Sequence, residues 1–261
     1  MNKHFFIKLI GLLAVVISLL LIFIYRNYIL KNEITYIYKY SQIQIPLNNK
    51  TKLNNNDTKN ISIKDETNNS TYAYVFLSVD GKTLIINPPI DGFHENSKIC
   101  IEINKDKTLY FKVKEHPPIK VSKFIGEPKY GDIVGTTDKF MGYKYDHLGI
   151  YIGNNKVIHY CSSTGNAIDA KIQETNMEPY FRKGNYFILN IENTVPFNSR
   201  ETVRRAKTRL GEKNYNLLQN NCEHFVIWCK TNNSECFQLE NLSEKEMVQI
   251  KIFTSLGINL Q

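Results

Sequence analysis

Two histidines and a cysteine have the residue types and spacing that a thiol-based catalytic site requires. His147 and His159 are the first and last residues of the string HLGIYIGNNKVIH, in which Asn154-Asn155 predicts a hairpin turn between two apolar strands. Antiparallel pairing across that turn brings the two imidazoles together, at the end of the hairpin away from the loop. Two neighbouring imidazoles can divide the roles of general base and base-orienting group. Either histidine taken alone is more simply a polar residue at a sheet margin.

Cys222 lies in the string QNNCEHFV, at the expected start of a helix. A cysteine in the first turn of a helix meets free backbone N–H groups and the positive end of the helix dipole, so we expect its thiol pKa to fall. The same N–H groups can receive the oxyanion of a reaction intermediate. The alternative, a small buried residue on an apolar helix face, is the interpretation we favour for Cys229. We expect His224 to cap the helix or to pack.

The elements that must position these residues predict an α+β domain, in which strands are followed by packed helices. One helix is expected from the cap Asn198-Ser199 to the stop at Gly211, and a second from Asn221-Cys222 onward. The strand-like runs are residues 132–137, 148–153, 156–161 and 186–192.

The N-terminal residues 5–25 are almost wholly apolar and long enough to cross a bilayer. A cleaved signal peptide is the alternative, because Lys3 and Lys8 form a basic region. The apolar run is longer than usual for a signal peptide and ends without a small-residue cleavage site. We therefore predict a single-pass membrane anchor over residues 1–30. The short N-terminus would stay in the cytoplasm and the remainder would be extracytoplasmic.

Four further regions follow the anchor. Residues 31–70 are expected to be a flexible linker, because their Asn-rich and Lys-rich part has few apolar residues. Residues 71–116 predict a small β unit, whose pattern resembles bacterial Ig-like surface modules. Residues 120–235 form the expected catalytic domain, and residues 236–261 a tail that is either a short amphipathic helix or extended.

Charge and cysteine usage exclude several functions. There are 33 Lys and Arg against 25 Asp and Glu, but the basic residues are scattered, which favours a solvated surface over nucleic-acid binding. The five cysteines are too few and too unevenly spaced for a disulfide framework, and none forms a CxxC pair or a zinc-like cluster. No motif requires a metal or a cofactor, and the sequence does not determine the oligomeric state.

Several strings together resemble one known family. These are PKYGDI (128–133), HLGIYIGNNKVIH, the segment with VRRA and LG (203–211), YNLL (215–218) and NNCEHFV. They resemble the lecithin:retinol acyltransferase (LRAT) family, over roughly residues 124–233. The fold that this resemblance implies is a circularly permuted papain-like domain of the NlpC type, in which the histidines precede the cysteine.

The resemblance also implies roles for individual residues. The family's nucleophile corresponds to Cys222, its base to His147 and its orienting polar residue to His159. The implied reaction is attack on an ester carbonyl, followed by transfer of the acyl group from cysteine to water, an amine or an alcohol. We further expect Tyr145 and Asn221 to contact the substrate.

Three functions remain open from the sequence. The leading one is a membrane-anchored thiol acyltransferase or phospholipase with a lipid acyl donor. The alternative is a permuted thiol peptidase or amidase acting on cell-wall peptide or protein amide bonds. The third, a surface-tethered binding protein, is disfavoured because all three residues of the site are intact. Vertebrate family members often have a C-terminal membrane segment, whereas here residues 239–261 are too charged to be one.

Overall fold

The computed structural model describes residues 35–48, 53–54, 56–65, 71–104, 107–115, 118–140, 143–164, 169–194 and 196–255. Its contacts divide the chain into Met1–Tyr36 and Ile37–Gln261, and the second unit contains nearly all of the described residues. The predicted membrane segment, residues 5–25, lies outside the described residues. Within the described ranges, no helix has the length and apolar character needed to cross a membrane.

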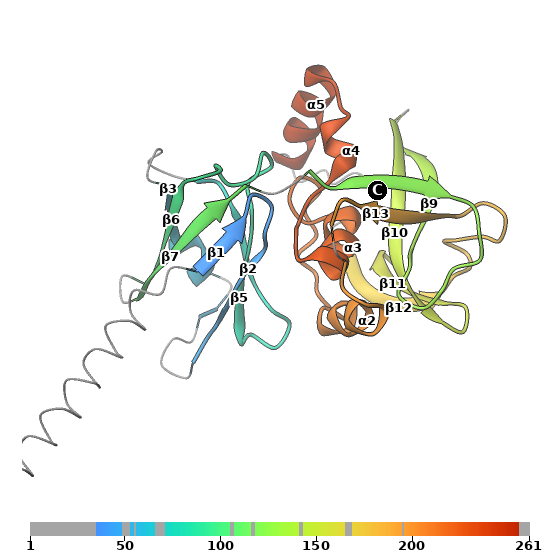
Figure 1. The fold of residues 1–261 in the computed structure, drawn as a ribbon, viewed down its shortest axis with the longest axis horizontal. Helices are drawn as coiled ribbons and strands as arrows, with labels where there is room; N and C mark the ends of the chain where they lie inside the picture. Colours follow the sequence, from blue (N-terminus) through green and yellow to red (C-terminus); the bar gives the residue numbers. More distant parts are fainter. Residues whose placement is uncertain are drawn as a thin grey trace, which may run out of the picture. The chain divides into compact units, whose positions relative to one another are not determined.

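The N-terminal part of this second unit is a small β structure built from two sheets (Figure 1). One sheet has the order β1-β7-β6-β3 and the other β2-β5-β4. Both contribute to one apolar core. In β6, for example, Ile99, Ile101 and Ile103 are buried on one face, as the two-residue period of a strand requires. The elements are β1 (Thr35–Tyr38), β2 (Ile43–Pro46), the 3-10 helix η1 (Asp57–Asn60), β3 (Ser62–Asp65), β4 (Tyr74–Leu77), β5 (Thr83–Asn87), β6 (Lys98–Ile103) and β7 (Lys107–Lys114).

The prediction of a flexible linker over residues 31–70 differs from the structure, which has strands in this range. Strands β1, β2 and β3 all lie inside that range and join the two sheets. Ile43 and Ile45 on β2, and Ile63 on β3, are buried in the same core as β6. Four-residue strands among polar segments leave almost no local signal, because their burial depends on partners far along the chain.

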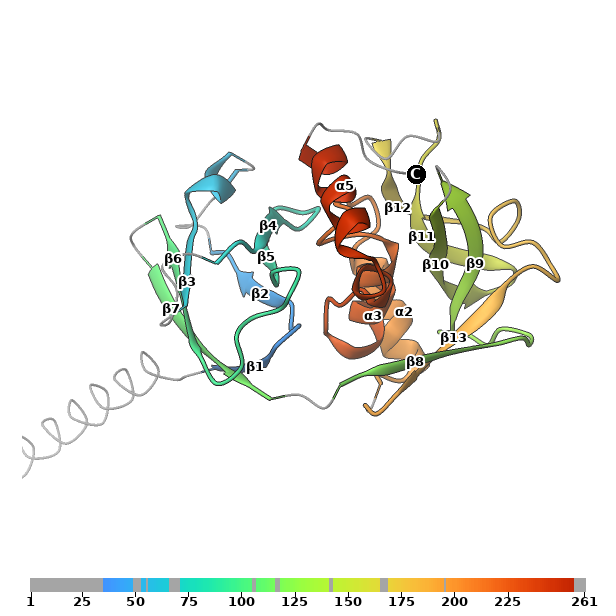
Figure 2. The same cartoon turned by 90° about the horizontal axis from the view of Figure 1, so that it is seen from above.

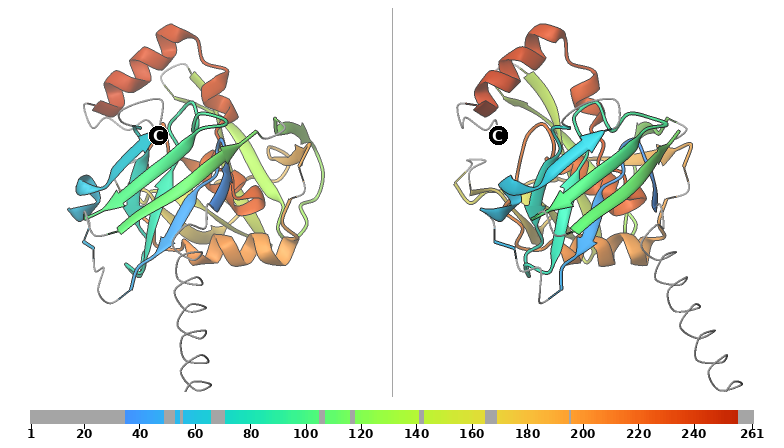
Figure 3. Two further views of the ribbon diagram at one scale, coloured as in Figure 1. Left: turned by 60° about the vertical axis from the view of Figure 1, so that its left-hand side comes forward. Right: turned by 90° about the vertical axis from the view of Figure 1, so that its left-hand side faces the viewer.

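The C-terminal part is an antiparallel six-stranded sheet with helices on one face (Figures 1 and 2). The strand order is β12-β11-β10-β9-β13-β8, and α2 and α3 pack together and against β10. Figure 3 shows α5 and α2 at opposite ends of the helical layer. The elements are β8 (Lys120–Phe124), β9 (Ile133–Phe140), β10 (Tyr143–Gly153), β11 (Lys156–Cys161), β12 (Lys171–Asn176), β13 (Phe187–Glu192), α2 (Ser199–Thr208), α3 (Cys222–Thr231), α4 (Phe237–Glu240) and α5 (Glu244–Ser255).

The expected α+β class is confirmed, and so are the main local signals. Asn154 and Asn155 both have positive φ, which is the backbone of a tight hairpin turn. The Asn198 side chain accepts a hydrogen bond from the Glu201 N–H at the start of α2. The sequence did not predict β8 and β12, because neither has a clear apolar run: only Ile172 of β12 is buried.

The two faces of the sheet have separate apolar cores. Leu148 and Ile150 of β10 pack against Phe225 of α3 in the larger core. The opposite face holds a smaller cluster that includes Val157 and Phe181. Because side chains alternate along a strand, odd-numbered residues of β10 and β11 point to this second face. His147 and His159 are therefore on the side of the sheet that α3 does not cover.

Candidate active site

Cys222 is the first residue of α3, and Asn221 is the N-cap of that helix. The Asn221 side-chain oxygen accepts hydrogen bonds from the N–H groups of Glu223 (2.9 Å) and His224 (3.1 Å). The His224 ring bonds in return to the Asn221 backbone N–H, which completes a capping box. The capping role predicted for His224 is thus confirmed, and the cap fixes the position of the cysteine.

The Cys222 sulfur lies against the backbone of β10, on either side of His147. Its Sγ donates to the carbonyl oxygen of Asp146 at 3.6 Å, and the Leu148 N–H also bonds to the sulfur. Asp146 is held in turn by Gln238, which accepts from the Asp146 N–H and donates to its carbonyl oxygen. The strand that positions the histidine therefore also positions the thiol.

His147, His159 and Thr175 form a hydrogen-bonded chain across β10, β11 and β12. The Thr175 hydroxyl donates its hydrogen to the Asn176 carbonyl oxygen at 3.0 Å, so it accepts from His159 Nε2 at 2.9 Å. The other nitrogen of a neutral His159, Nδ1, then accepts from His147 Nε2 at 2.7 Å. In a neutral His147 this leaves Nδ1 without a hydrogen, so Nδ1 is the nitrogen that can accept a proton. The predicted proximity of the two histidines is confirmed.

A glycine makes the close approach of these strands possible. Gly149 is paired directly with His159 in the β10–β11 register. A Cβ at position 149 would lie 2.9 Å from the Cβ of His159 and 2.5 Å from Cγ2 of Val157. The Phe181 ring stacks on the His147 ring, with centroids 5.4 Å apart, and covers the pair from the second face of the sheet.

The thiol pKa predicted from the helix start was wrong. Burial raises the pKa of Cys222 to about 12, against the lowering effect of the backbone N–H groups around the sulfur, and the nearby Glu223 carboxyl adds to the rise. Burial likewise lowers the pKa of His147 to about 4, opposed by Asp138. His159 is fully buried and its pKa is also lowered, by burial and by His147. Removal of water from the site outweighs the helix dipole, so thiol and imidazoles are neutral at rest.

The two predicted substrate contacts, Tyr145 and Asn221, both line the pocket at Cys222. Asn221 uses its oxygen for the helix cap, and its amide donates to the Leu217 carbonyl oxygen (2.9 Å) and to Cys236 Sγ (3.3 Å). Its polar groups are thus occupied within the protein. Burial raises the pKa of Tyr145 to about 12, followed by the effects of Asp138 and Cys222, so its hydroxyl is a hydrogen-bond donor.

A buried polar network behind the nucleophile was not predicted from the sequence. Arg209 donates to Glu212 (2.8 Å) and to the Asn220 side-chain oxygen (2.8 Å), and the Asn220 amide bonds to the Tyr160 hydroxyl (3.0 Å). Burial alone would raise the pKa of Glu212, but Arg209 and the hydrogen bonds outweigh it and lower the pKa. Removing one member of a buried ion pair costs about 3–5 kcal/mol, so this network anchors the segment that leads to Cys222.

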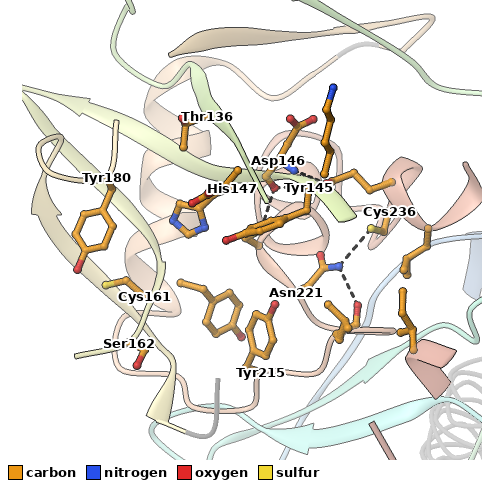
Figure 4. A pocket seen from close by; sticks show the side chains of 18 of the residues that line it. Thr136, Tyr145, Asp146, His147, Cys161, Ser162, Tyr180, Tyr215, Asn221 and Cys236 are labelled. Atoms are coloured by element: carbon orange, nitrogen blue, oxygen red, sulfur yellow. Dashed lines mark hydrogen bonds between the residues drawn. The ribbon is translucent and has the colours of Figure 1, made fainter. Parts of the chain in front are cut away.

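Tyr145, Asp146, His147 and Asn221 border one cavity of about 400 Å³ (Figure 4). His147, Tyr145, Tyr215 and Asn221 face the same space in the close-up. Cys222 lines it as well, so the nucleophile and base predicted from the sequence meet in one pocket. Among the residues that the structure describes, no group of three His, Cys, Asp or Glu side chains could hold a metal ion.

The comparison with known proteins agrees with the resemblance expected from the sequence. A profile of the lecithin retinol acyltransferase family matches residues 126–235, a segment that contains Cys222 and both site histidines. Lecithin retinol acyltransferase of Rattus norvegicus is 26% identical over 133 residues, covering 41% of this chain and 58% of the rat protein. Phospholipase A and acyltransferase 4 of Homo sapiens is 27% identical over 147 residues, covering 51% of this chain and 85% of that protein. Residues 126–235 therefore form a domain of the lecithin retinol acyltransferase family.

Proposed function

We propose that this chain is a membrane-anchored thiol acyltransferase or phospholipase that works through an acyl-cysteine intermediate. The observation that supports it most is the convergence of Cys222 and His147 on one pocket. The relatives that share the domain have names that specify acyl transfer and phospholipid cleavage. The order of the site residues, histidines before cysteine, also agrees with the permuted papain-like fold that we expect.

In the first half of the reaction, His147 Nδ1 takes the proton of the Cys222 thiol while the sulfur attacks the ester carbonyl carbon. His159 Nδ1 accepts a hydrogen bond from the Nε2–H of His147. This bond holds the His147 ring in the tautomer whose Nδ1 can take the thiol proton. When the tetrahedral intermediate collapses, the carbon–oxygen bond breaks and His147 returns the proton to the leaving alcohol. The acyl group is then a thioester of Cys222.

The oxyanion of that intermediate needs donors that the resting site does not already use. The N–H groups of Glu223 and His224 are bonded to the Asn221 side chain. We therefore assign the oxyanion to the N–H of Cys222 itself, at the start of the helix, and to the hydroxyl of Tyr145. Loss of one such donor from an acyl-transfer site lowers kcat by about 100- to 1,000-fold.

In the second half, an acceptor attacks the thioester carbonyl and the carbon–sulfur bond breaks. His147 removes the proton of the acceptor and returns it to the departing sulfur. Water as the acceptor gives a phospholipase, whereas an alcohol or amine gives an acyltransferase. The same residues perform either outcome, so access of the acceptor to the cavity decides between them.

Residues 5–25 would anchor the enzyme beside its lipid substrate, with the catalytic domain on the extracytoplasmic side. Protease treatment of intact cells tests this topology directly. Digestion of residues 37–261 from outside is expected, and full protection of them in intact cells would reverse the assigned orientation.

The mass of the protein tests the reaction. The full chain, in detergent or lipid nanodiscs, is exposed briefly to diacylphospholipid. An added acyl mass that maps to Cys222 is expected, absent in Cys222→Ala and retained in Cys100→Ala, which removes a cysteine of the β unit. Release of cell-wall peptide without lipid turnover would instead support the amidase alternative. Lipid turnover unchanged in Cys222→Ala would exclude the thiol mechanism.

A further inference from the structure

The active-site cavity extends past the matched family domain. That domain ends at residue 235, yet Leu239, Leu242 and Ile250 line the same cavity as Cys222. Leu239 lies on α4, Leu242 follows it, and Ile250 lies on α5. The wall that these helices provide therefore lies beyond the segment that the family profile matches.

Apart from Gln238 of α4, which bonds to the backbone of Asp146, the side chains that these helices and Leu242 contribute to the cavity are aliphatic. Leu239 and Ile250 are 8% and 7% exposed and belong to one cluster, with Leu218 and Cys236 as its other buried members. Leu217 and Leu242 are partly buried against the same cluster. Branched aliphatic side chains around an open volume form the surface that a hydrocarbon chain contacts in place of water.

Charge in the cavity comes from the sheet and not from α4 or α5. The charged side chains that border it are Asp138, Lys144 and Asp146, and all three come from β9 and β10. Cys222 is close to both groups of residues, because its sulfur bonds to the Asp146 carbonyl oxygen and the carboxyl of the next residue, Glu223, accepts from the N–H of Gln238 on α4. A substrate with a polar end and an apolar end therefore has one favourable direction in the cavity.

We infer that α4 and α5 form a subsite for one linear aliphatic acyl chain, whose carbonyl lies at Cys222 and whose tail packs against Leu239, Leu242 and Ile250. This inference rests on the proposed acyl transfer and specifies its substrate. The volume of about 400 Å³ is near the lower end of the roughly 300–1,000 Å³ of small-molecule sites, so the cavity accepts one chain and not a whole diacyl lipid. The head group and second chain stay outside, on the β9–β10 side.

Hydrolysis of p-nitrophenyl esters of increasing chain length, by the full chain in detergent, tests the subsite. Each methylene that enters an apolar site contributes about 0.8 kcal/mol, so kcat/KM should rise about fourfold per methylene from acetate until the subsite is full. Ile250→Trp places a larger side chain in the aliphatic lining of the cavity. We expect the ratio of decanoate to acetate hydrolysis to fall at least tenfold relative to the wild type, the equivalent of about two excluded methylenes.

Val248→Trp is the matched control, because Val248 lies on the same helix but is 54% exposed. It should show the wild-type dependence on chain length. Leu242→Trp narrows the cavity at a half-buried position. It provides the test of chain-length dependence if Ile250→Trp also loses acetate hydrolysis through misfolding. A chain-length dependence that is unchanged in both cavity variants would overturn the subsite while leaving the thiol mechanism intact. Ester hydrolysis that persists in Cys222→Ala would overturn the proposed function itself.

Discussion

Replacing Thr175 by Val removes the last member of the histidine chain. The His159 Nε2–H then loses its acceptor inside a fully buried residue. An unsatisfied buried donor costs about 1–3 kcal/mol, which equals roughly 5- to 150-fold in rate if the cost falls on the productive orientation of His147. Thr175 itself is half-buried, so water can replace part of the bond. We therefore expect kcat to fall about 5- to 20-fold, at the lower end of that range.

Steady-state ester hydrolysis separates a positioning role from a structural one. Thr175 does not line the cavity, so KM should stay within about twofold of the wild type while kcat falls. Thr175→Ser keeps the hydroxyl and should restore kcat, which makes it the matched control. Melting temperatures of both variants report on folding. A Thr175→Val protein with lower melting temperature and unchanged kcat would refute the tautomer argument, since the hydroxyl would then serve stability alone.

Three further predictions concern the same site. Alkylation of Cys222 by iodoacetamide, measured by mass spectrometry, should accelerate about tenfold per pH unit from pH 6 to 9, because burial holds its thiol pKa near 12. A rate that reaches a plateau in that range would contradict this pKa. The acid limb of kcat/KM should lie near pH 4, because His147 must be unprotonated to act as base and its pKa is about 4; a fall centred near pH 6.5 would show an ordinary imidazole. Gly149→Ala should reduce both kcat and melting temperature, at a cost of about 1–3 kcal/mol, because the new methyl group meets the Cβ of His159; Gly126→Ala, whose new Cβ has no contact closer than 3.5 Å, should resemble the wild type.

The arrangement of the candidate site residues could be predicted because their signals are local. The turn at Asn154-Asn155 sets the register of one hairpin, and that register alone brings His147 and His159 together. The polar residue before Cys222 is a helix cap, and the cap determines where the cysteine lies on α3. Each inference needs only a few neighbouring residues, so tertiary packing had little chance to overturn it.

The features that were missed depend on distant parts of the chain. Thr175 lies on β12, a strand with one buried residue, and only the pairing of β12 with β11 places it at His159. The thiol pKa of Cys222 depends on how completely the surrounding elements exclude water, which no short string encodes. The apolar wall at Ile250 forms because α4 and α5 fold back onto the domain. In each case the feature depends on contacts between segments that are distant in the sequence, and no local pattern predicts that they pack together.

Burial has the same consequence for Cys222 and His147, the proposed nucleophile and base. It raises the pKa of Cys222 and lowers that of His147, so each change disfavours the thiolate–imidazolium form at rest. Transfer of the thiol proton from Cys222 to His147 is then favourable only when the negative charge develops on the carbonyl oxygen of a bound substrate at the start of α3. In a site of this kind the cysteine stays a neutral thiol until the carbonyl of an acyl group lies beside it in the cavity. If α4 and α5 select the acyl chain as we propose, the burial that keeps the Cys222 thiol neutral also makes its reaction depend on the chain bound in the cavity.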